Sequence, residues 1–429
     1  MLWLYRLLFL PALLVLAPYY GWRMRRRGGY GHKFSQRFGA GHSLPAKRAG
    51  IRRIWLQAVS VGEVLAIEPV IDALTRDGST EVYLTTTTST GYQLARDRFA
   101  GRVLSTGYFP IDWWVLSRRA WRSIQPDLVI LTEGERWPEH LAQAKQRGVP
   151  VIAMNARLSD RSFRRMRRFG FVNAAVLGGL TRVLPCSTQD ELRFRELGIP
   201  AEKLFTTGNI KLDVRIVRLS EPERAQLRRE LGLGEGRVLL GSSTWPGEEA
   251  ALLAAWQKSR VAGIDCSLLI VPRHAERRAE IEQLLTEAKV TFHFRSRGHA
   301  PGVVDVAVGD TTGELRRLTQ LADLVFVGKS LPPNEGGQTP VEAAALEKPL
   351  LMGPRMSNFR VIAAELRSQG AAQEVADANA LQSEVVNLLG DRHRREAMAR
   401  AAGEWQRSNA GAVDRTLRVI REELAKLPT

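Results

Sequence analysis

Short apolar runs of strand-forming residues alternate with helical stretches along most of the chain, and this alternation limits the fold more than any other feature. The first set of strand candidates is Ile54–Val59, Val82–Thr86, Leu128–Leu131, Val151–Asn155 and Val183–Cys186. The second set is Val238–Gly241, Ser267–Val271, Val304–Val306, Leu324–Val327 and Leu350–Met352. Strands that alternate with helices pair in parallel through helical crossovers. The pattern therefore predicts an α/β protein with two parallel sheets.

The length and the linker signals place the domain boundaries. At 429 residues the chain exceeds the size of about 250–300 residues at which single cores stop growing. Residues 214–236 are polar, highly charged and glycine-rich at their end, which predicts a linker. We predict two Rossmann-like domains, 23–213 and 237–395, that face each other across a cleft, followed by a helical segment at 396–429.

The N-terminal residues have the pattern of a membrane anchor. Residues 7–22 are uncharged and mostly apolar, and they end in an aromatic cluster. The cations that follow, without any acid, are Arg23, Arg25, Arg26, Arg27, Lys33 and Arg37. This order predicts an anchor at residues 1–22 with a cytoplasmic basic flank. A cleaved signal peptide is disfavoured because the charges follow the apolar run. Since Pro11 and Pro18 interrupt the run, crossing the bilayer and lying within it both stay open.

Charge and cysteine content narrow the class of partner. The formal net charge is +17, and six arginines lie in residues 157–168 against the single acid Asp160. Nucleic acid and anionic membrane both fit such an excess, and the neighbouring anchor favours the membrane. The two cysteines, Cys186 and Cys266, lie far apart and fit neither a disulfide framework nor a zinc site. No HExxH, CxxC or Asp-x-Asp pattern occurs, so we predict no metal site. Because an anionic membrane accounts for the positive charge, we predict no nucleic-acid partner.

The stretch from Ile54 to Val64 is the strongest candidate for a catalytic turn. A predicted strand runs into Ser-Val-Gly, and Glu63 then stands where a helix over Val64–Leu74 should begin. Ligands of open α/β sheets bind at the carboxyl ends of strands, where helix N-termini offer N–H groups. A Glu there can take a proton from a bound hydroxyl. On spacing alone, a Glu that complements the helix dipole is the stronger interpretation, and the remaining motifs reverse it.

Further polar loops follow predicted strands in both halves. In the first half they are Thr85–Gly91, Leu131–Pro138, Asn155–Arg161 and Thr207–Asp213. In the second half they are Gly241–Glu249, Pro272–His274, Asp310–Leu315, Gly328–Ser330 and Asn334–Glu342. The hydroxyls of Thr85–Gly91 can cap a helix or bind a sugar. The turn Gly241–Glu249 leads into a helix and suits an anion. Arg273 can bind a phosphate or a carboxylate. Each loop alone fits ordinary turn chemistry, but their common place at strand ends indicates a site.

Together these motifs resemble the 3-deoxy-D-manno-octulosonic acid (Kdo) transferases of lipopolysaccharide biosynthesis, over nearly the whole chain. The most specific pieces are Ser60–Glu63, Asn155–Ser159, Thr207–Lys211, Pro272–His274 and Gly353-Pro354 followed by Asn358-Phe359. The resemblance implies a GT-B glycosyltransferase that transfers Kdo from CMP-Kdo to a lipid A precursor with inversion, without a metal or other cofactor. It also implies a location at the cytoplasmic face of the inner membrane, an acceptor-binding first domain, a CMP-Kdo-binding second domain and a C-terminal helix that packs back on the first.

The resemblance also assigns residues. Glu63 falls at the catalytic base and Glu135 on the second Glu of a Glu-Thr-Glu-x-Trp-Pro motif. The expected donor-binding residues are Arg273, His274, Gly313, Glu314, Gly328, Lys329, Ser330 and Glu342. The expected acceptor-binding residues are Ser60, Gly62, Thr87, Thr88, Arg157, Arg161 and Lys211. The chain departs from the family pattern at Lys329, where Gly is usual, and at Gln338 and Thr339, where His and Asn are usual.

Two other functions remain to be weighed against this one. A related nucleotide-sugar enzyme with a soluble substrate, such as an epimerase, would keep its turnover when residues 1–22 are deleted. A basic RNA- or membrane-binding scaffold with a degenerate site would release no CMP with any acceptor.

Overall fold

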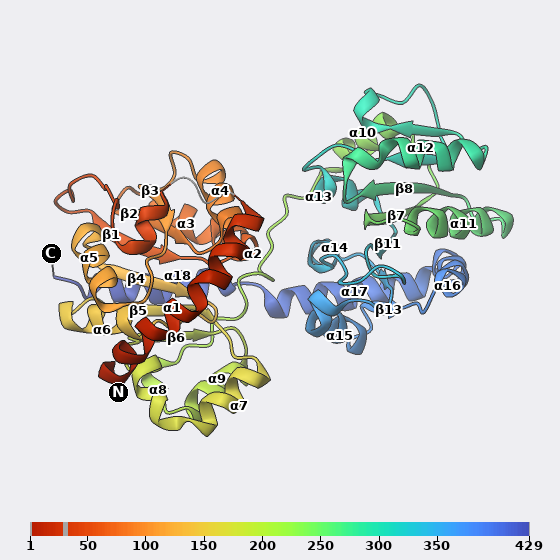
Figure 1. Ribbon diagram of the computed structural model, residues 1–429. Coiled ribbons are helices and arrows are strands. Elements are labelled where there is room, and N and C mark those ends of the chain that lie inside the picture. The colour runs from red at the N-terminus through yellow and green to blue at the C-terminus, as the bar shows by residue number, and fades with distance from the viewer. Residues whose placement is uncertain (1, 29–32, 429) are drawn as a thin grey trace. The chain divides into compact units, whose positions relative to one another are not determined.

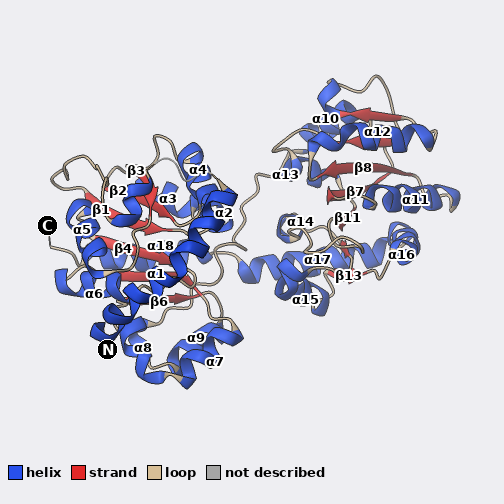
Figure 2. Cartoon of the chain, viewed as in Figure 1, coloured by secondary structure: helices blue, strands red, loops and turns tan. Residues whose placement is uncertain are grey.

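The computed structural model describes residues 2–28 and 33–428, and the chain divides into two compact units (Figure 1). Unit 1 comprises Met1–Asp213 and Ala410–Thr429, and unit 2 comprises Val214–Asn409. Met1 and Thr429, the outer bounds of the predicted anchor and C-terminal segment, lie outside the described residues. In each unit the strands form one sheet with helices packed around it (Figure 2).

Unit 1 contains a six-stranded parallel sheet in the order β3-β2-β1-β4-β5-β6. Its strands are β1 (Arg52–Gln57), β2 (Thr80–Thr86), β3 (Ser105–Tyr108), β4 (Leu128–Thr132), β5 (Val151–Ala156) and β6 (Arg182–Pro185). Its helices are α1 (Leu2–Arg27), α2 (Val61–Ala66), α3 (Glu68–Thr75), α4 (Ser89–Arg98), α5 (Trp114–Ile124), α6 (Pro138–Arg147), α7 (Asp160–Arg168), α8 (Gly170–Leu177), α9 (Thr188–Glu196) and α18 (Ala412–Ala425).

The central strand β4 shows why this sheet is covered on both faces. All five of its residues are buried. Leu128 and Ile130 belong to one hydrophobic cluster, and Val129 and Leu131 belong to another. Because successive side chains of a strand point to opposite faces, the two clusters lie on opposite sides of the sheet. A strand buried on both faces reads as the continuous apolar run that made it predictable.

Unit 2 contains a seven-stranded parallel sheet in the order β13-β12-β11-β7-β8-β10-β9. Its strands are β7 (Arg237–Thr244), β8 (Cys266–Pro272), β9 (Phe292–Phe294), β10 (Val306–Val308), β11 (Leu324–Val327), β12 (Leu350–Met352) and β13 (Ala372–Glu374). Its helices are α10 (Glu221–Leu231), α11 (Glu248–Val261), α12 (Arg278–Glu287), α13 (Leu315–Leu318), α14 (Val341–Ala345), α15 (Arg360–Ser368), α16 (Ala378–Gly390) and α17 (Arg392–Asn409).

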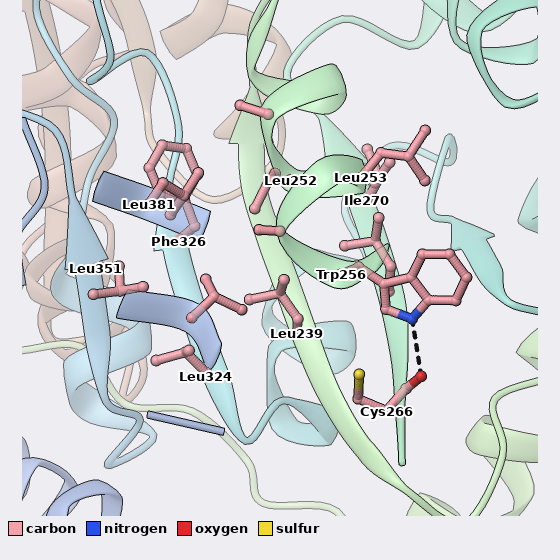
Figure 3. Close-up of a cluster of buried hydrophobic side chains, with 14 of the residues drawn as sticks. Leu239, Leu252, Leu253, Trp256, Cys266, Ile270, Leu324, Phe326, Leu351 and Leu381 are labelled. Atoms are coloured by element: carbon pink, nitrogen blue, oxygen red, sulfur yellow. Dashed lines mark hydrogen bonds between the residues drawn. The ribbon is translucent and has the colours of Figure 1, made fainter. Parts of the chain in front are cut away.

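The core of unit 2 lies between its sheet and α11 with α16 (Figure 3). Leu239 and Phe326 from the sheet lie in one buried cluster with Leu252 from α11 and Leu381 from α16. Trp256 belongs to the same cluster, and its indole N–H donates to the carbonyl of Cys266 at 2.9 Å. The polar atom of this large side chain is therefore satisfied inside the core.

The predicted strands are present, and three strands were missed. These three, β3, β9 and β13, are all edge strands of their sheets. These three strands are short and lack a continuous apolar run: β3 reads Ser-Thr-Gly-Tyr, and β13 reads Ala-Gln-Glu with two exposed residues. The predicted helix Val64–Leu74 is two helices, α2 and α3, because Pro69 begins a new helix at the first turn of α3.

The connections between the units differ from the prediction at both ends. The predicted linker 214–236 contains α10, whose Leu227 and Leu231 are fully buried in unit 2. The predicted segment 396–429 is split after residue 409 between α17 of unit 2 and α18 of unit 1. Five residues of α18 enter the core of unit 1, namely Ala412, Val413, Leu417, Val419 and Ile420. The first unit is therefore completed by the end of the chain.

The predicted anchor lies within α1. By length and composition this helix can cross a membrane, and none of its most apolar 18-residue window is buried. Large exposed side chains occur along it, for example Trp3, Leu7 and Val15.

Candidate functional site

The order of strands in unit 1 places two of the predicted motifs side by side. Strands β2 and β3 continue the sheet on one side of β1, and β5 and β6 continue it beyond β4, so the strand order reverses between β1 and β4. Ligand crevices of open α/β sheets lie at such a reversal, outside the carboxyl ends of the strands. Ser60–Glu63 follows β1 and Glu133–Trp137 follows β4. The two carboxylate-bearing turns are therefore neighbours.

Glu63 lies in the first turn of α2 and is 7% exposed. Its carboxylate accepts hydrogen bonds from the Val59 N–H at 3.0 Å, the Ser60 hydroxyl at 3.1 Å and the Thr132 hydroxyl at 2.5 Å. All three donors are neutral, and Glu63 forms no ion pair with any of the residues that the structure describes. The carboxylate is thus positioned without a counter-ion. Thr132, the last residue of β4, was not predicted as a site residue.

Glu135 is half-buried close to Glu63. Burial raises the pKa of its carboxyl group to about 7; the Trp137 indole opposes this shift by donating a hydrogen bond at 2.7 Å, and the negative charge of Glu63 adds to it. Glu135 is therefore partly protonated near neutral pH. Two interacting carboxyl groups in different environments form a pair suited to acid and base roles.

Two predicted acceptor-binding cations face a third carboxylate. Glu133 adopts a left-handed backbone conformation with φ of 51°. Its carboxylate lies 3.3 Å from the Arg157 guanidinium and also contacts the Lys211 ammonium. Arg157 and Lys211 are therefore held together by a residue that was not assigned a role. Arg161 lies apart from them on the exposed surface of α7.

The hydroxyl-rich loop after β2 is used largely for local structure. The Thr88 hydroxyl caps α4 by accepting from the Gly91 N–H at 3.1 Å, and it donates to the Val59 carbonyl at 3.0 Å. The Thr87 hydroxyl accepts from Gln57 at 2.9 Å. For Thr88 the structure thus favours the helix-cap interpretation over contact with a sugar. A Cβ atom added at Gly62 would meet open space, so the chain around this residue is accessible.

In unit 2 the strand order reverses between β7 and β11, and predicted donor residues gather there. Lys329, after β11, places its ammonium 4.1 Å from the ring centroid of Trp245, after β7. The His274 ring packs edge-on against the same indole at 5.3 Å. Arg273 is exposed, and its backbone N–H donates to the Thr244 carbonyl at 3.1 Å. Trp245 thus contacts two predicted donor residues, Lys329 and His274, although it was not itself predicted as a site residue.

A buried carboxylate organises the loop that carries Lys329. Glu248, at the start of α11, is 1% exposed. It accepts from the backbone N–H groups of Trp245 at 2.9 Å, Lys329 at 2.8 Å, Ser330 at 2.9 Å and Leu331 at 3.1 Å. The turn at Gly241–Glu249, which we predicted to suit an anion, is thus filled by the chain's own carboxylate. Glu248 was not predicted as a site residue, although the sequence shows a Glu directly after Gly247 at the start of a helix.

Other predicted donor residues have partners within unit 2. Ser330 is fully buried; its hydroxyl donates to the Val327 carbonyl at 2.5 Å and accepts from the Gly353 N–H at 2.8 Å. Its side chain therefore supports the loop, and the expected contact of Ser330 with the donor stays a prediction. A Cβ at Gly328 would lie 2.2 Å from the Ser243 carbonyl oxygen, so this glycine serves close packing.

The acidic donor residues are engaged by arginines. The Glu342 carboxylate lies 2.7 Å from the Arg316 guanidinium, so the expected contact of Glu342 with the donor requires this pair to open or to share the carboxylate. Glu314 lies 3.4 Å from Arg295. Gly313 has a φ of 88° with no atom near a Cβ position. Among residues 2–28 and 33–428, no group of three or more His, Cys, Asp or Glu side chains is placed to hold a metal ion.

Known proteins match the chain at the level of sequence and of fold. A family model described as 3-deoxy-D-manno-octulosonic-acid transferase (kdotransferase) matches residues 32–214. The 3-deoxy-D-manno-octulosonic acid transferase of Bordetella pertussis is 35% identical over 417 residues, which cover 94% of each chain. The corresponding transferase of Haemophilus influenzae is 31% identical, over 98% of this chain and 96% of the relative.

Solved structures support the class of fold. The UDP-GlcNAc 2-epimerase of Neisseria meningitidis bound to UDP-GlcNAc has a TM-score of 0.55 and 14% identity, over 88% of this chain and all of the neighbour. A glycosyltransferase of Rickettsia africae has a TM-score of 0.55 and 13% identity over the same shares. At this identity the likeness concerns the fold alone, and it confirms the predicted class of two Rossmann-like α/β domains of the GT-B type.

Proposed function

Because the chain belongs to the 3-deoxy-D-manno-octulosonic acid transferase family of glycosyltransferases, we propose that it transfers Kdo from CMP-Kdo to a hydroxyl of a lipid A precursor and releases CMP. The proposed place of this reaction is the cytoplasmic face of the inner membrane. The observation that carries the proposal is the pair Glu63 and Glu135 at the strand-order reversal of unit 1. An epimerase is not favoured, since the Neisseria meningitidis epimerase with the same fold is only 14% identical to this chain.

In the proposed reaction Glu63 is the general base. It takes the proton from the acceptor hydroxyl, whose oxygen attacks the anomeric carbon of Kdo on the face opposite the CMP leaving group, so the configuration inverts. Its neutral hydroxyl partners, Ser60 and Thr132, can both donate and accept, so they can rotate when Glu63 becomes protonated. An arginine or lysine partner would instead hold the carboxylate as an anion and weaken it as a base.

Glu135 is proposed to share the acceptor proton with Glu63. Its pKa of about 7 allows it to hold or release a proton at cytoplasmic pH. On the donor side, Arg273 and Lys329 supply positive charge for the phosphate that leaves with CMP. Trp245 and His274 border the same position and would shape it. No cofactor besides the donor substrate is included in this proposal.

The test is transfer by a Glu63→Gln variant in vesicles supplied with CMP-Kdo and tetra-acylated lipid A precursor. We expect kcat to fall on the order of 10²–10⁴-fold, the usual effect of losing a general base, while CMP binding measured by calorimetry is unchanged. Asp77→Asn, which alters an exposed acid of the same unit, is the matched control and should retain wild-type turnover. Mass spectrometry of the product counts the sugars added. Near-normal transfer by Glu63→Gln would refute the assigned role.

A further inference from the structure

The first turns of the apolar helix α1 are bonded to the folded part of unit 1. The Tyr5 hydroxyl donates to the Asp112 carboxylate at 2.6 Å. The Arg6 guanidinium makes two hydrogen bonds to the Glu139 carboxylate, at 2.8 and 3.1 Å. Such a bidentate pair fixes both distance and direction. We call these four residues the α1 lock.

The carboxylates of the α1 lock belong to the interior of unit 1. Asp112 is 1% exposed, and it also accepts from the N–H groups of Glu139 and His140 at the start of α6. Glu139 is fully buried. A buried carboxylate needs a partner, and Arg6 is the cation paired with Glu139 in the described residues. Unit 1 is thus built to receive the N-terminal turns of α1.

This contact decides between the two orientations that the sequence left open. At 26 residues α1 is about 39 Å long, enough to cross a hydrocarbon core of about 30 Å. A crossing helix would carry Tyr5 and Arg6 to the face of the membrane opposite Arg23 and Arg25, and the α1 lock would have to break. With the lock closed, both ends of α1 stay on the side of the folded unit.

The surface of α1 fits a lipid environment in this orientation. Half-buried residues recur at helical spacing, at Leu2, Tyr5, Phe9 and Leu13, which marks one covered face. The large side chains on the other faces are exposed, and Trp3 reaches 76%. A helix that is apolar all round is typical of a protein core or of a membrane span, so the composition of α1 alone does not favour the in-plane orientation. That orientation follows from the α1 lock, which ties one face of α1 to unit 1.

Neighbouring residues extend this surface and give it charge. Trp114 and Val115 at the start of α5 are exposed, and the Arg6 guanidinium lies 5.6 Å from the Trp114 ring centroid. At the other end of α1, Arg23, Arg25 and Arg26 supply positive charge for anionic headgroups.

We propose that α1 lies in the plane of an anionic bilayer, held against unit 1 by the α1 lock, and does not span the membrane. The proposal deepens the proposed function, because it rests on that function's membrane location and specifies how the acceptor-binding unit meets the surface that carries the lipid. Unit 1 then sits directly on the membrane, with α1 and the start of α5 submerged in the interface.

The first test is the sidedness of the two ends in the full chain. The protein carries protease-cleavable tags at both termini and is reconstituted into vesicles of phosphatidylethanolamine and phosphatidylglycerol. Protease added outside should remove the two tags to the same extent, because an in-plane α1 leaves both termini on one side. A spanning α1 would place the two tags of each molecule on opposite sides, so that the protease cuts one tag and leaves the other intact; this result would overturn the proposal. Failure of the protein to bind the vesicles would overturn it as well.

The second test reads the α1 lock directly and leaves its four residues intact. A photoreactive benzoylphenylalanine replaces Phe9 on the covered face, and a matched variant carries it at Leu7 on an exposed face. We expect the probe at position 9 to cross-link to peptides of unit 1 and the probe at position 7 to label lipid. Labelling of lipid alone from both positions would overturn the proposal. Kdo transfer measured in the same vesicles separates this result from the proposed activity, since transfer can persist with a spanning helix.

Discussion

Replacing Glu248 by Gln should destabilise unit 2 and weaken its binding of the donor. Each carboxylate oxygen of Glu248 accepts two backbone N–H groups: one accepts from Ser330 and Leu331, and the other from Trp245 and Lys329. An amide has only one oxygen, so in either orientation two N–H groups lose their acceptor and face an NH2 group. Hydrogen bonds to a charged group contribute about 1.5–3 kcal/mol each, which gives a loss of about 3–6 kcal/mol.

Part of this loss is offset because the variant no longer buries a charge. Burial raises the pKa of Glu248, although the four N–H groups oppose the shift, so ionising this carboxyl inside unit 2 is costly. We therefore expect a net loss of about 2–4 kcal/mol. The loop that carries Lys329 loses its support at the same time, and CMP-Kdo should bind more weakly.

The measurements are urea unfolding followed by tryptophan fluorescence, and calorimetric titration with CMP. Glu335→Gln, at an exposed acid paired with Arg355, is the control and should change the unfolding free energy by less than about 0.5 kcal/mol. Wild-type stability together with wild-type CMP affinity in Glu248→Gln would show that this carboxylate does not hold the loop.

Three further changes test other parts of the structure. Because the folded-state pKa of Glu135 is raised to about 7, the wild-type protein loses stability as the pH rises from the usual carboxyl pKa through 7. The melting temperature of Glu135→Gln minus that of wild type should therefore be larger at pH 8 than at pH 5. An equal difference at the two pH values would contradict the pKa shift. Lys329→Gly should raise the free energy of unfolding by about 1 kcal/mol, because glycine adopts the φ of 58° at this position without strain. The same variant should bind CMP-Kdo more weakly and with less dependence on salt in calorimetry. Unchanged binding would show that Lys329 does not belong to the donor site. Arg53→Met should lower the free energy of unfolding, measured in urea, by about 3–5 kcal/mol, because it leaves the buried Glu81 carboxylate, 2.6 Å from Arg53, without its main partner. Arg96→Met, which breaks the exposed pair with Asp97, is the control. An equally small loss in both variants would show that the buried ion pair does not stabilise unit 1.

The sequence predicted the central strands of both sheets and one edge strand, β6, but missed the other three edge strands, for a physical reason. Central strands such as β4 and β11 are buried on both faces and are therefore apolar over most of their length, whereas an edge strand such as β13 needs few apolar residues. The ends of the predicted linker were misplaced because α10 is amphipathic and highly charged, and its two buried leucines were outweighed by the surrounding polar residues.

The site was predictable where a motif carries its own chemistry. Glu63 follows a strand and a glycine, so its position was evident before the sheet order was known. Thr132 and Trp245 were missed because their roles depend on which strands become neighbours, and a single sequence does not reveal that order. The capping role of Thr88 was one of the two interpretations that its spacing allowed.

The return of the chain to its first unit has a consequence for biosynthesis. Residues 214–409 are translated after most of unit 1 and before α18. During that interval the nascent protein, which already contains the apolar helix α1, exposes the core residues of unit 1 against which Leu417 and Ile420 will pack. Because α18 is translated after all the other elements of unit 1, a truncation before residue 412 should yield an aggregation-prone, inactive product.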